Sequence, residues 1–463
     1  MSFYFFISFN PFNRDLEELE PSDLAVLREK AEGWFIEYKS EVVSVKKIAK
    51  SLAAFANHYG GWIFYGVKEA DDGSHLAGSF PGLDRQEVLS LIESIRNAAK
   101  DVVSPSPYYD HKILDGPCSE IGLLDEKSVV VVAVPSSPDT PYIHSDGRIY
   151  RRIADSSDPK PETDRFTLDH LWQRGQRARD KLASFLEKEP ILSEAESERS
   201  FIDIFLLPDP LGASGQSSRL TFSRFVELMS DPNAPGINMR YDNFYTMPDG
   251  FIGRWVGTNP PFNLVVTWRH FRNGFSLVSI PFSSVKLGTP FVEEWLHSYE
   301  QEKAILELIH RGRYHYGHLL NINQLIFLVL AVVRQQKRLM EEGKIRGPLY
   351  AKAALHNVWR RIPLLDTETF IRFTSEYGLP VIQFNDEFAP PDKTFESLRR
   401  IPEKESPEGD HPMVIQGRES ALLVADILDA LGLPAEEILG SPTEEFRAEP
   451  DWWLAALRHS VYK

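Results

Sequence analysis

The chain has 463 residues, of which 42% are hydrophobic and 25% are charged. The length predicts two or three domains, and the composition excludes collagen-like, coiled-coil and disordered chains. The formal net charge of −16 excludes a global basic field, so that any binding of nucleic acid requires a local basic patch. The single cysteine excludes an internal disulfide and a thiolate zinc site, and it favours a cytoplasmic location.

Two apolar segments are long enough to be compared with membrane or targeting signals. The longest apolar run, residues 325–333, is about half as long as a membrane-spanning helix, so we expect a buried helix there and no membrane partner. Residues 1–10 are apolar but lack the basic start and the cleavage site of a signal peptide. We expect an N-terminal strand or extension in their place.

The first 190 residues alternate between helix-like and strand-like segments. Residues 42–56 have apolar side chains at the spacing of an amphipathic helix, and residues 62–67 form an apolar run that predicts a strand buried on both faces. The other expected elements are helices at 21–33, 84–100 and from 166 onward, and strands at 34–39, near 120–124, near 128–134 and within 147–159. This alternation predicts an α/β (α+β) domain with a mixed central sheet.

The pattern of apolar and polar residues changes after a polar linker at residues 187–198. Two alternating apolar segments flank Asn273-Gly274, which is a strong signal for a β-hairpin. Helical periodicity then returns after Glu293. We therefore expect three parts: an N-terminal domain at 1–190, a β-rich module at 200–290 and an α-rich region at 291–463.

Three carboxylates lie at or near the ends of the expected elements in the first domain: Glu32, Glu37 and Glu69. The ends of buried strands are where an α/β sheet opens to a ligand. If the strands that carry Glu37 and Glu69 are neighbours, the three carboxylates can surround a hard cation, and Lys39 can hold a phosphate. The alternative is that Glu37 and Lys39 form an ordinary solvated pair on a strand.

A local basic patch is the second candidate site. Phosphate contacts from basic side chains and stacking on an aromatic ring are the usual means of binding RNA. The residues expected to bind nucleic acid in this way are Lys46, Lys50, Arg148, Tyr150, Arg151 and Arg152. The alternative is a solvated face whose arginines pair with Asp155, Asp158 and Asp164.

Asn57 and His58 precede the Gly60-Gly61 pair. We expect Asn57 and the two glycines to shape a tight turn before the buried strand, because glycine tolerates positive φ and close backbone approach. His58 is expected to be exposed, where it is either incidental or a general acid or base.

Five segments in order resemble the Schlafen AlbA_2 domain, a family formerly described as a divergent AAA or DNA-binding module. The segments are EGWFIEYKS, IAKSLAAFANHYGG, WIFYGVKE, VAVPSSPDTPYI and GRIYRRIADSS, within about residues 15–175. The family pattern E-x4-E-[FY]-K is present as Glu32, Glu37, Tyr38 and Lys39, and Glu69 stands where the endoribonuclease members carry Asp.

The resemblance implies a divalent-metal-dependent endoribonuclease acting on structured RNA such as tRNA or rRNA. Glu32, Glu37 and Glu69 would bind Mg²⁺ or Mn²⁺, and these three with Lys39 would be the catalytic residues. The alternative is a non-catalytic nucleic-acid-binding or regulatory module, including a stress or phage-defence effector. The sequence leaves open whether the chain forms a homodimer and whether its C-terminal region binds a protein.

Overall fold

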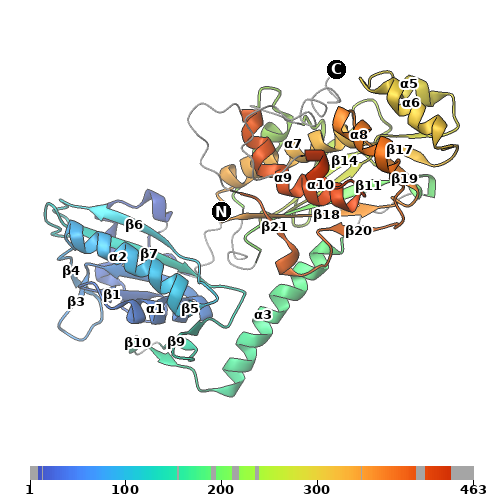
Figure 1. Ribbon diagram of the computed structural model, residues 1–463. Coiled ribbons are helices and arrows are strands. Elements are labelled where there is room, and N and C mark those ends of the chain that lie inside the picture. Colours follow the sequence, from blue (N-terminus) through green and yellow to red (C-terminus); the bar gives the residue numbers. More distant parts are fainter. Residues whose placement is uncertain are drawn as a thin grey trace. The chain divides into compact units, whose positions relative to one another are not determined.

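The computed structural model describes residues 9–12, 14–153, 156–188, 194–210, 218–234, 239–345, 347–402 and 412–439. They form two compact units, and the boundary falls between Leu182 and Ala183, inside one helix (Figure 1). Most of the expected N-terminal segment and the last 24 residues of the expected α-rich region, 440–463, lie outside the described residues. No described helix combines the length and the apolar character needed to span a bilayer.

The first unit is built on a mixed four-stranded sheet with the order β1-β2-β7-β6. The strands are β1 (Ile36–Lys39), β2 (Gly60–Tyr65), β6 (Asp110–Asp115) and β7 (Ser128–Pro135). β1 pairs with β2 in parallel, whereas β7 pairs with both β2 and β6 in the antiparallel sense. The predicted α+β domain with a mixed central sheet is therefore confirmed.

Alternating side chains of the central strands pack on opposite faces of this sheet. On one face Ile63 and Val132 pack against the helices α1 (Val45–Asn57) and α2 (Arg85–Asn97). On the other face Phe64 and Val131 pack against the 3₁₀ helix η2 (Pro21–Glu29). Because both faces are covered, these strands read as continuous apolar runs rather than alternating ones, as predicted for residues 62–67.

The remaining elements of the first unit are short, apart from its last helix. They are η1 (Leu16–Glu18), β3 (Lys68–Glu69), β4 (Ala77–Ser79), the π-helical turn η3 (Ala98–Val102), β5 (Val103–Ser104), β8 (Ile143–His144), β9 (Tyr150–Ile153), β10 (Ser156–Pro161) and α3 (Arg165–Leu186). The strand expected near 120–124 is a turn closed by a bridge between Cys118 and Leu123. Its few apolar side chains fill the core beside η2 without extending the sheet.

The Gly60-Gly61 turn carries the chain from α1 into β2. Gly60 has a φ of +75°, and a Cβ at Gly61 would lie 2.8 Å from the carbonyl oxygen of Phe35 and would overlap the ring of Phe55. We expect Gly61→Ala to lower the free energy of unfolding by about 1–3 kcal/mol, because the well-packed core must shift. Urea unfolding followed by circular dichroism measures this loss.

Gly253→Ala is the matched control for that variant. Gly253 also lies in a strand, and a Cβ there meets its nearest neighbour at an ordinary 3.4 Å. An equal effect of the two substitutions would contradict the steric explanation for Gly61.

The second unit contains an eight-stranded sheet with the order β12-β13-β14-β15-β11-β18-β20, in which β21 also pairs with β18. The strands are β11 (Phe201–Pro208), β12 (Asn243–Met247), β13 (Gly250–Trp255), β14 (Val266–Phe271), β15 (Ser276–Pro281), β18 (Leu349–His356), β20 (Glu387–Ala389) and β21 (Arg399–Arg400). β14 and β15 form the hairpin predicted around Asn273-Gly274, with Gly274 at a φ of +84°.

The predicted buried helix is the centre of α7 (Ile322–Glu342), whose residues 325–333 are all buried. The other elements are η4 (Glu194–Glu196), α4 (Phe222–Ser230), β16 (Ser284–Lys286), α5 (Phe291–Leu296), α6 (Glu302–Arg311), β17 (His318–Asn321), β19 (Arg361–Leu364), α8 (Glu368–Tyr377), η5 (Phe395–Ser397), α9 (Pro412–Ala430) and α10 (Ala435–Leu439). β16, β17 and β19 form a separate three-stranded sheet.

The expected parts 200–290 and 291–463 share one core. β18 and β20 lie in the same sheet as β11 to β15, and buried side chains from Ile202 to Ile438 form one hydrophobic cluster. The strand-rich segment pairs with strands more than 60 residues away, which local periodicity does not reveal. The boundary expected near residue 290 therefore does not separate two cores in the described residues.

Candidate functional site

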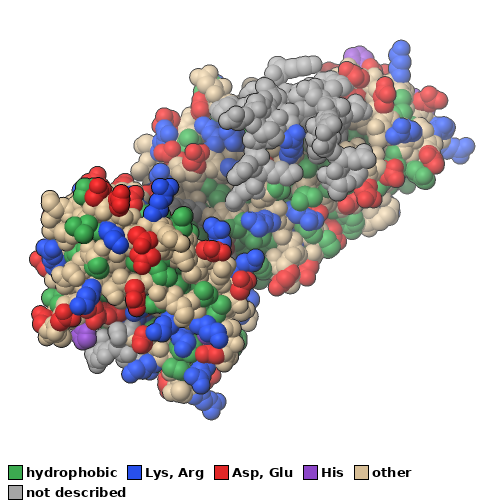
Figure 2. Space-filling model, turned by 60° about the vertical axis from the view of Figure 1, so that its left-hand side comes forward, with side chains coloured by type: hydrophobic (Ala, Val, Ile, Leu, Met, Phe, Trp, Pro, Cys, Tyr) green, Lys and Arg blue, Asp and Glu red, His purple; other side chains and the backbone are tan. Residues whose placement is uncertain are grey.

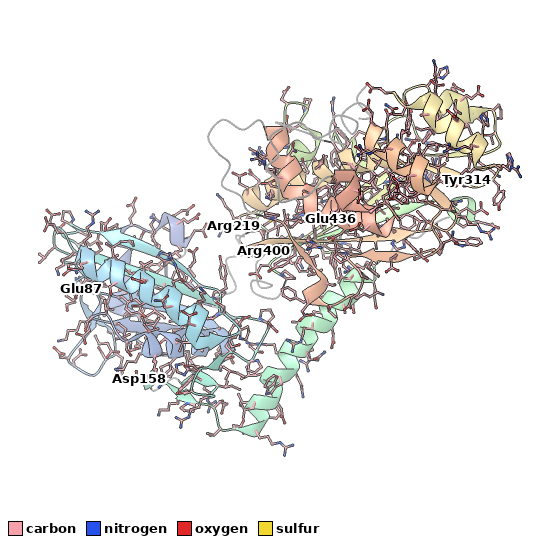
Figure 3. All side chains as sticks on the ribbon, in the orientation of Figure 1. Glu87, Asp158, Arg219, Tyr314, Arg400 and Glu436 are labelled. Carbon is pink, nitrogen blue, oxygen red and sulfur yellow. The ribbon has the colours of Figure 1, made fainter. Side chains whose placement is uncertain are left out.

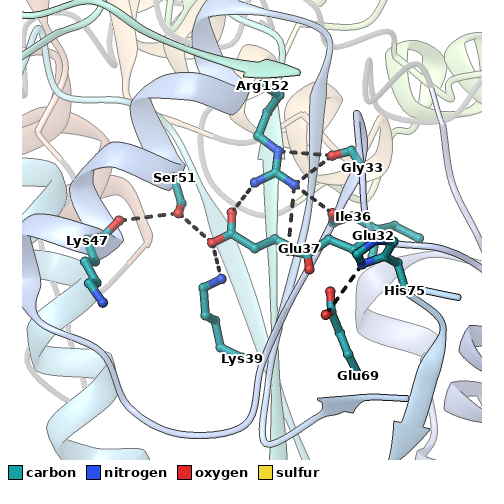
Figure 4. A network of polar contacts seen from close by, with 10 residues as sticks. All are labelled: Glu32, Gly33, Ile36, Glu37, Lys39, Lys47, Ser51, Glu69, His75 and Arg152. Atoms are coloured by element: carbon teal, nitrogen blue, oxygen red, sulfur yellow. Dashed lines mark hydrogen bonds and ion pairs between the residues drawn. The ribbon is translucent and has the colours of Figure 1, made fainter. Parts of the chain in front are cut away.

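Three segments of the first unit bring Glu32, Glu37 and Glu69 to one place (Figure 4). Glu37 lies on β1 and Glu69 on β3, and Glu32 lies between η2 and β1. The amide of Glu32 donates to the carbonyl of His75 at 2.8 Å, in the turn that joins β3 to β4. This bond and the adjacent bridge between Ala31 and Leu76 hold Glu32 beside the β3–β4 hairpin, and so beside Glu69.

Glu37 is enclosed by hydrogen-bond donors. Its Oε1 accepts from the Ser51 hydroxyl at 2.8 Å and lies 2.9 Å from the Lys39 ammonium, while its Oε2 accepts from Arg152 at 2.9 Å. Only 1% of its side chain is exposed. Both carboxylate oxygens are therefore occupied by protein groups, as buried charges require.

Arg152 is the centre of this network, and it is fully buried. Its Nη2 donates to the carbonyls of Gly33 at 2.7 Å and Ile36 at 3.1 Å, and its Nε donates to Gly33 at 3.0 Å. The guanidinium also lies over the ring of Phe55, and Nη2 is 3.8 Å from Oε1 of Glu32. Arg152 therefore fixes the backbone between Glu32 and Glu37.

The carboxyl group of Glu32 is protonated at neutral pH. Burial and a hydrogen bond to Glu69 raise the pKa of Glu32 to about 9, although Lys39 opposes the shift. One oxygen of each carboxyl group, Oε1, is buried without a hydrogen-bond partner. His75 lies 3.7 Å from Oε2 of Glu69. Burial is the largest cause of the raised pKa of Glu32, and it outweighs the nearby positive charge of Lys39.

The fit of a divalent cation differs among the three carboxylates. Hard cations prefer oxygen ligands, and Mg²⁺ is usually bound through one or two carboxylates while it keeps several waters. The unpartnered oxygens of Glu32 and Glu69 suit such a cation, whereas the oxygens of Glu37 are occupied. Within the described ranges, no three Asp, Glu, His or Cys side chains are grouped closely enough to hold a metal.

Lys39 supplies a positive charge at the edge of this network. Burial alone would lower the pKa of Lys39, but the negative charges of Glu37, Glu32 and Asp158 raise it above its usual value. Asp158 lies on β10 (Figure 3). With 17% of its side chain exposed, Lys39 is a permanent cation that solvent and ligands can reach.

The structure corrects the expected basic patch. Arg152 and Tyr150 are buried, and the Tyr150 hydroxyl donates to Asp146 at 2.6 Å. The Arg152 side chain binds groups in the distant segment 33–37, and the Tyr150 ring packs inside the domain. They therefore have no surface on which to contact RNA.

The other four residues of that set reach the surface to different degrees. Lys46 and Arg148 are exposed, Lys50 is partly buried with its ammonium 5.0 Å from the centre of the Tyr150 ring, and Arg151 pairs with Glu162 at 2.8 Å. Basic and acidic side chains are interspersed on the face of the first unit that Figure 2 shows. That face therefore carries acidic side chains among its basic ones.

Asn57 has a structural role. Its side-chain amide donates to the carbonyls of Tyr142 and Tyr150, and its carbonyl oxygen accepts from the amide of Tyr142 at 2.7 Å. His58 follows it, and burial together with the charges of Arg174 and Arg151 lowers the pKa of His58 to about 4. His58 is therefore neutral at physiological pH.

Two residues of the site were missed from the sequence, Ser51 and Trp34. Ser51 points inward from the apolar face of α1, and a hydroxyl in an apolar stripe was the signal for a buried polar partner. Trp34 lies two residues after Glu32 in the sequence and is 36% exposed. An exposed tryptophan beside a candidate carboxylate was the corresponding signal for a surface role.

Comparison with known proteins identifies the part of the chain that carries this site. The family model Schlafen, AlbA_2 matches residues 32–161, a range that includes every residue of the carboxylate network. A crystal structure of the DIP2311 protein from Corynebacterium diphtheriae is similar at 14% identity and a TM-score of 0.20, over 46% of this chain and 38% of that chain. No curated protein matches significantly.

The TM-score of the structural match is too low to support a conclusion about fold or function. The family match covers the segments that carry the resemblance, from Glu32 to the strand that contains Arg152. A Schlafen AlbA_2 domain points to a nucleic-acid-related function. Residues 32–161 of this chain are therefore a Schlafen AlbA_2 domain.

Proposed function

We propose that the AlbA_2 domain is a divalent-cation-dependent endoribonuclease that acts on structured RNA such as tRNA or rRNA. The observation that carries the proposal is the buried carboxyl group of Glu32, which is protonated at neutral pH and lies beside the partly exposed Glu69. The Oε1 atom of each has no hydrogen-bond partner. Buried carboxyl groups with strongly shifted pKa values are concentrated at functional sites.

In this proposal Glu32 and Glu69 hold Mg²⁺ or Mn²⁺ after Glu32 has lost its proton. The bound cation supplies a water of lowered pKa and neutralises charge on the phosphate. Lys39 remains protonated and stabilises the negative charge that develops on the phosphate oxygens. Glu37 holds Lys39 and Arg152 in place and is not a cation ligand.

The RNA backbone would lie along the exposed cations of the domain. Lys46 and Arg148 are exposed and Arg151 is partly exposed, so that each can contact a phosphate. These contacts are few, and the chain as a whole carries a net charge of −16. We therefore expect binding that depends strongly on salt and on the shape of the RNA.

The second candidate is a non-catalytic nucleic-acid-binding or regulatory module. The observation that favours it is the engagement of Glu37 with Ser51, Lys39 and Arg152, which removes the third acidic ligand. In that case the network would only stabilise the fold beneath an RNA-binding surface.

The test is cleavage of labelled tRNA by the full chain in Mn²⁺, in Mg²⁺ and in EDTA. We expect cleavage only with the cation, and we expect Glu69→Gln to reduce the rate by about 100-fold or more, since losing even an outer-shell partner of a metal costs 10- to 100-fold. Glu93→Gln on α2 is the matched control, because Glu93 is an exposed glutamate away from the network.

Cleavage that continues in EDTA, or equally in Glu69→Gln, would overturn the nuclease assignment. RNA binding without any cleavage in the wild type would favour the regulatory module. Circular dichroism of each variant establishes that a lost activity does not reflect a lost fold.

A further inference from the structure

Three aromatic side chains form an exposed cluster on the AlbA_2 domain: Trp34, His58 and Tyr59. The Trp34 and His58 rings stack with centroids 5.0 Å apart and an interplanar angle of 12°, and Tyr59 packs edge-on against both. Trp34 remains 36% exposed and Tyr59 52% exposed. Contiguous exposed aromatic surface on a folded domain usually marks a binding site.

The cluster adjoins the carboxylate network through the backbone. Trp34 directly follows Gly33, whose carbonyl accepts two hydrogen bonds from Arg152. The amide of Gly33 in turn donates to the carbonyl of Ile36 at 3.0 Å. The Trp34 backbone is therefore held next to Glu32 by the same guanidinium that holds Glu37.

The opposite side of the cluster is fixed by Arg174 from α3. Its guanidinium donates to the carbonyls of Ala56 and Asn57, the last two residues of α1, and to that of His58, which follows the helix. The Ser136 hydroxyl also donates to the His58 carbonyl at 2.8 Å. The aromatic platform is thus preformed, so that little conformational entropy is lost when a ligand binds.

Two arginines lie near the rings, of which Arg151 is also paired with Glu162. Arg174 and Arg151 both lie close enough to His58 to act on its ionisation, and the side chain of Arg151 is one-third exposed. The imidazole itself stays neutral, so that the rings offer stacking faces and the arginines offer charge. Stacked aromatics beside basic groups are how proteins bind the unpaired bases of single-stranded RNA.

We propose that an unpaired nucleobase of an RNA ligand stacks on Trp34 and Tyr59, with its phosphate facing Arg151. The inference rests on the proposed function for the class of ligand, but it concerns binding and not cleavage. A base held at Trp34 would place an adjacent phosphodiester toward Glu32. The domain would therefore select RNA that has an unpaired segment over a continuous duplex.

The test uses a 12-nucleotide single-stranded RNA that contains one 2-aminopurine, and the same strand annealed to its complement. The fluorescence of 2-aminopurine is quenched when the base stacks. Titrations with the full chain in EDTA separate binding from any cleavage. We expect the wild type to bind and quench the single strand and to bind the duplex more weakly.

We expect Trp34→Leu to lose roughly 5- to 100-fold in affinity for the single strand, which corresponds to one stacked base, and to lose the quenching. Trp34→Phe should retain most of both. Trp359→Leu in the second unit is the matched control, because Trp359 is 49% exposed and the Arg360 guanidinium already lies 4.1 Å from its ring centre. Trp34 is a surface residue, and thermal unfolding verifies that the variants fold.

Equal binding by Trp34→Leu and the wild type would overturn the inference, and so would tighter binding of the duplex. The inference would also be overturned if Trp34 bound another protein and the chain did not bind the single-stranded RNA. The two proposals fail separately. Trp34-dependent binding of RNA without Mn²⁺-dependent cleavage supports this inference and contradicts the nuclease. Mn²⁺-dependent cleavage that is undiminished in Trp34→Leu supports the nuclease and contradicts this inference.

Discussion

Replacing Arg152 with Met should lower the free energy of unfolding of the first unit by about 3–5 kcal/mol, the cost of leaving a buried charge without its partner. The guanidinium is fully buried, and it satisfies one oxygen of Glu37 and the carbonyls of Gly33 and Ile36. Methionine fills a similar volume but donates no hydrogen bond. Urea unfolding monitored by circular dichroism measures the loss.

Three further variants make this result specific. Arg148→Met removes an exposed arginine two residues before β9, and should change stability by less than about 0.5 kcal/mol. Arg152→Lys should not restore stability, because an ammonium group cannot replace the planar fork of donors. In a protein that already carries Glu37→Gln, Arg152→Met should lower the free energy of unfolding by less than it does in the wild type.

An Arg152→Met protein as stable as the wild type would show that the network does not support the fold. It would also remove the physical reason for the position of Glu32, since Arg152 holds the intervening backbone.

The second large effect is a dependence of stability on pH that comes from Glu32. Its pKa is about 9 in the folded protein and near its ordinary value of 4.5 when unfolded. Between these values the folded state holds a proton that the unfolded state has lost, so the stability that Glu32 contributes is complete below pH 4.5 and disappears as the pH rises toward 9. At about 1.4 kcal/mol for each pKa unit, the total is on the order of 6 kcal/mol.

Glu32→Gln removes this titration, because the amide stays neutral at every pH. In EDTA we expect the wild type to lose stability relative to Glu32→Gln as the pH rises from 5 to 9, while Glu93→Gln follows the wild type. Melting temperatures across this range provide the measurement. Parallel curves for the wild type and Glu32→Gln would mean that Glu32 is ionised in the folded protein at neutral pH.

Local sequence patterns predicted the elements that position the site. The apolar spacing of residues 42–56 predicted α1, and the run at 62–67 predicted a strand covered on both faces, now seen as β2. The Asn273-Gly274 turn predicted the β14–β15 hairpin. In each case the signal lies within a few residues, because helix and strand periods and turn geometry are local properties.

The predictions that depended on exposure were less successful. Arg152 and Tyr150 lie in a polar, basic stretch, yet both are buried. Their partners, Glu37 for Arg152 and Asn57 for the Tyr150 carbonyl, are about 90 or more residues away along the chain. A charged residue is buried at low cost only where the fold supplies such a partner, and no local sequence pattern contains that information.

The amino-acid sequence by itself determined the class of the N-terminal domain, its helix and strand positions, and the identity of the acids near their ends. The tertiary structure determined which of these acids is paired with basic groups and which keeps its proton. Glu37 is paired with Arg152 and Lys39, whereas Glu32, which lies beside the β3–β4 hairpin, keeps its proton at neutral pH. The reason is electrostatic, because in a buried cluster the nearest positive charge determines which carboxylate ionises, and that neighbour is supplied by the fold.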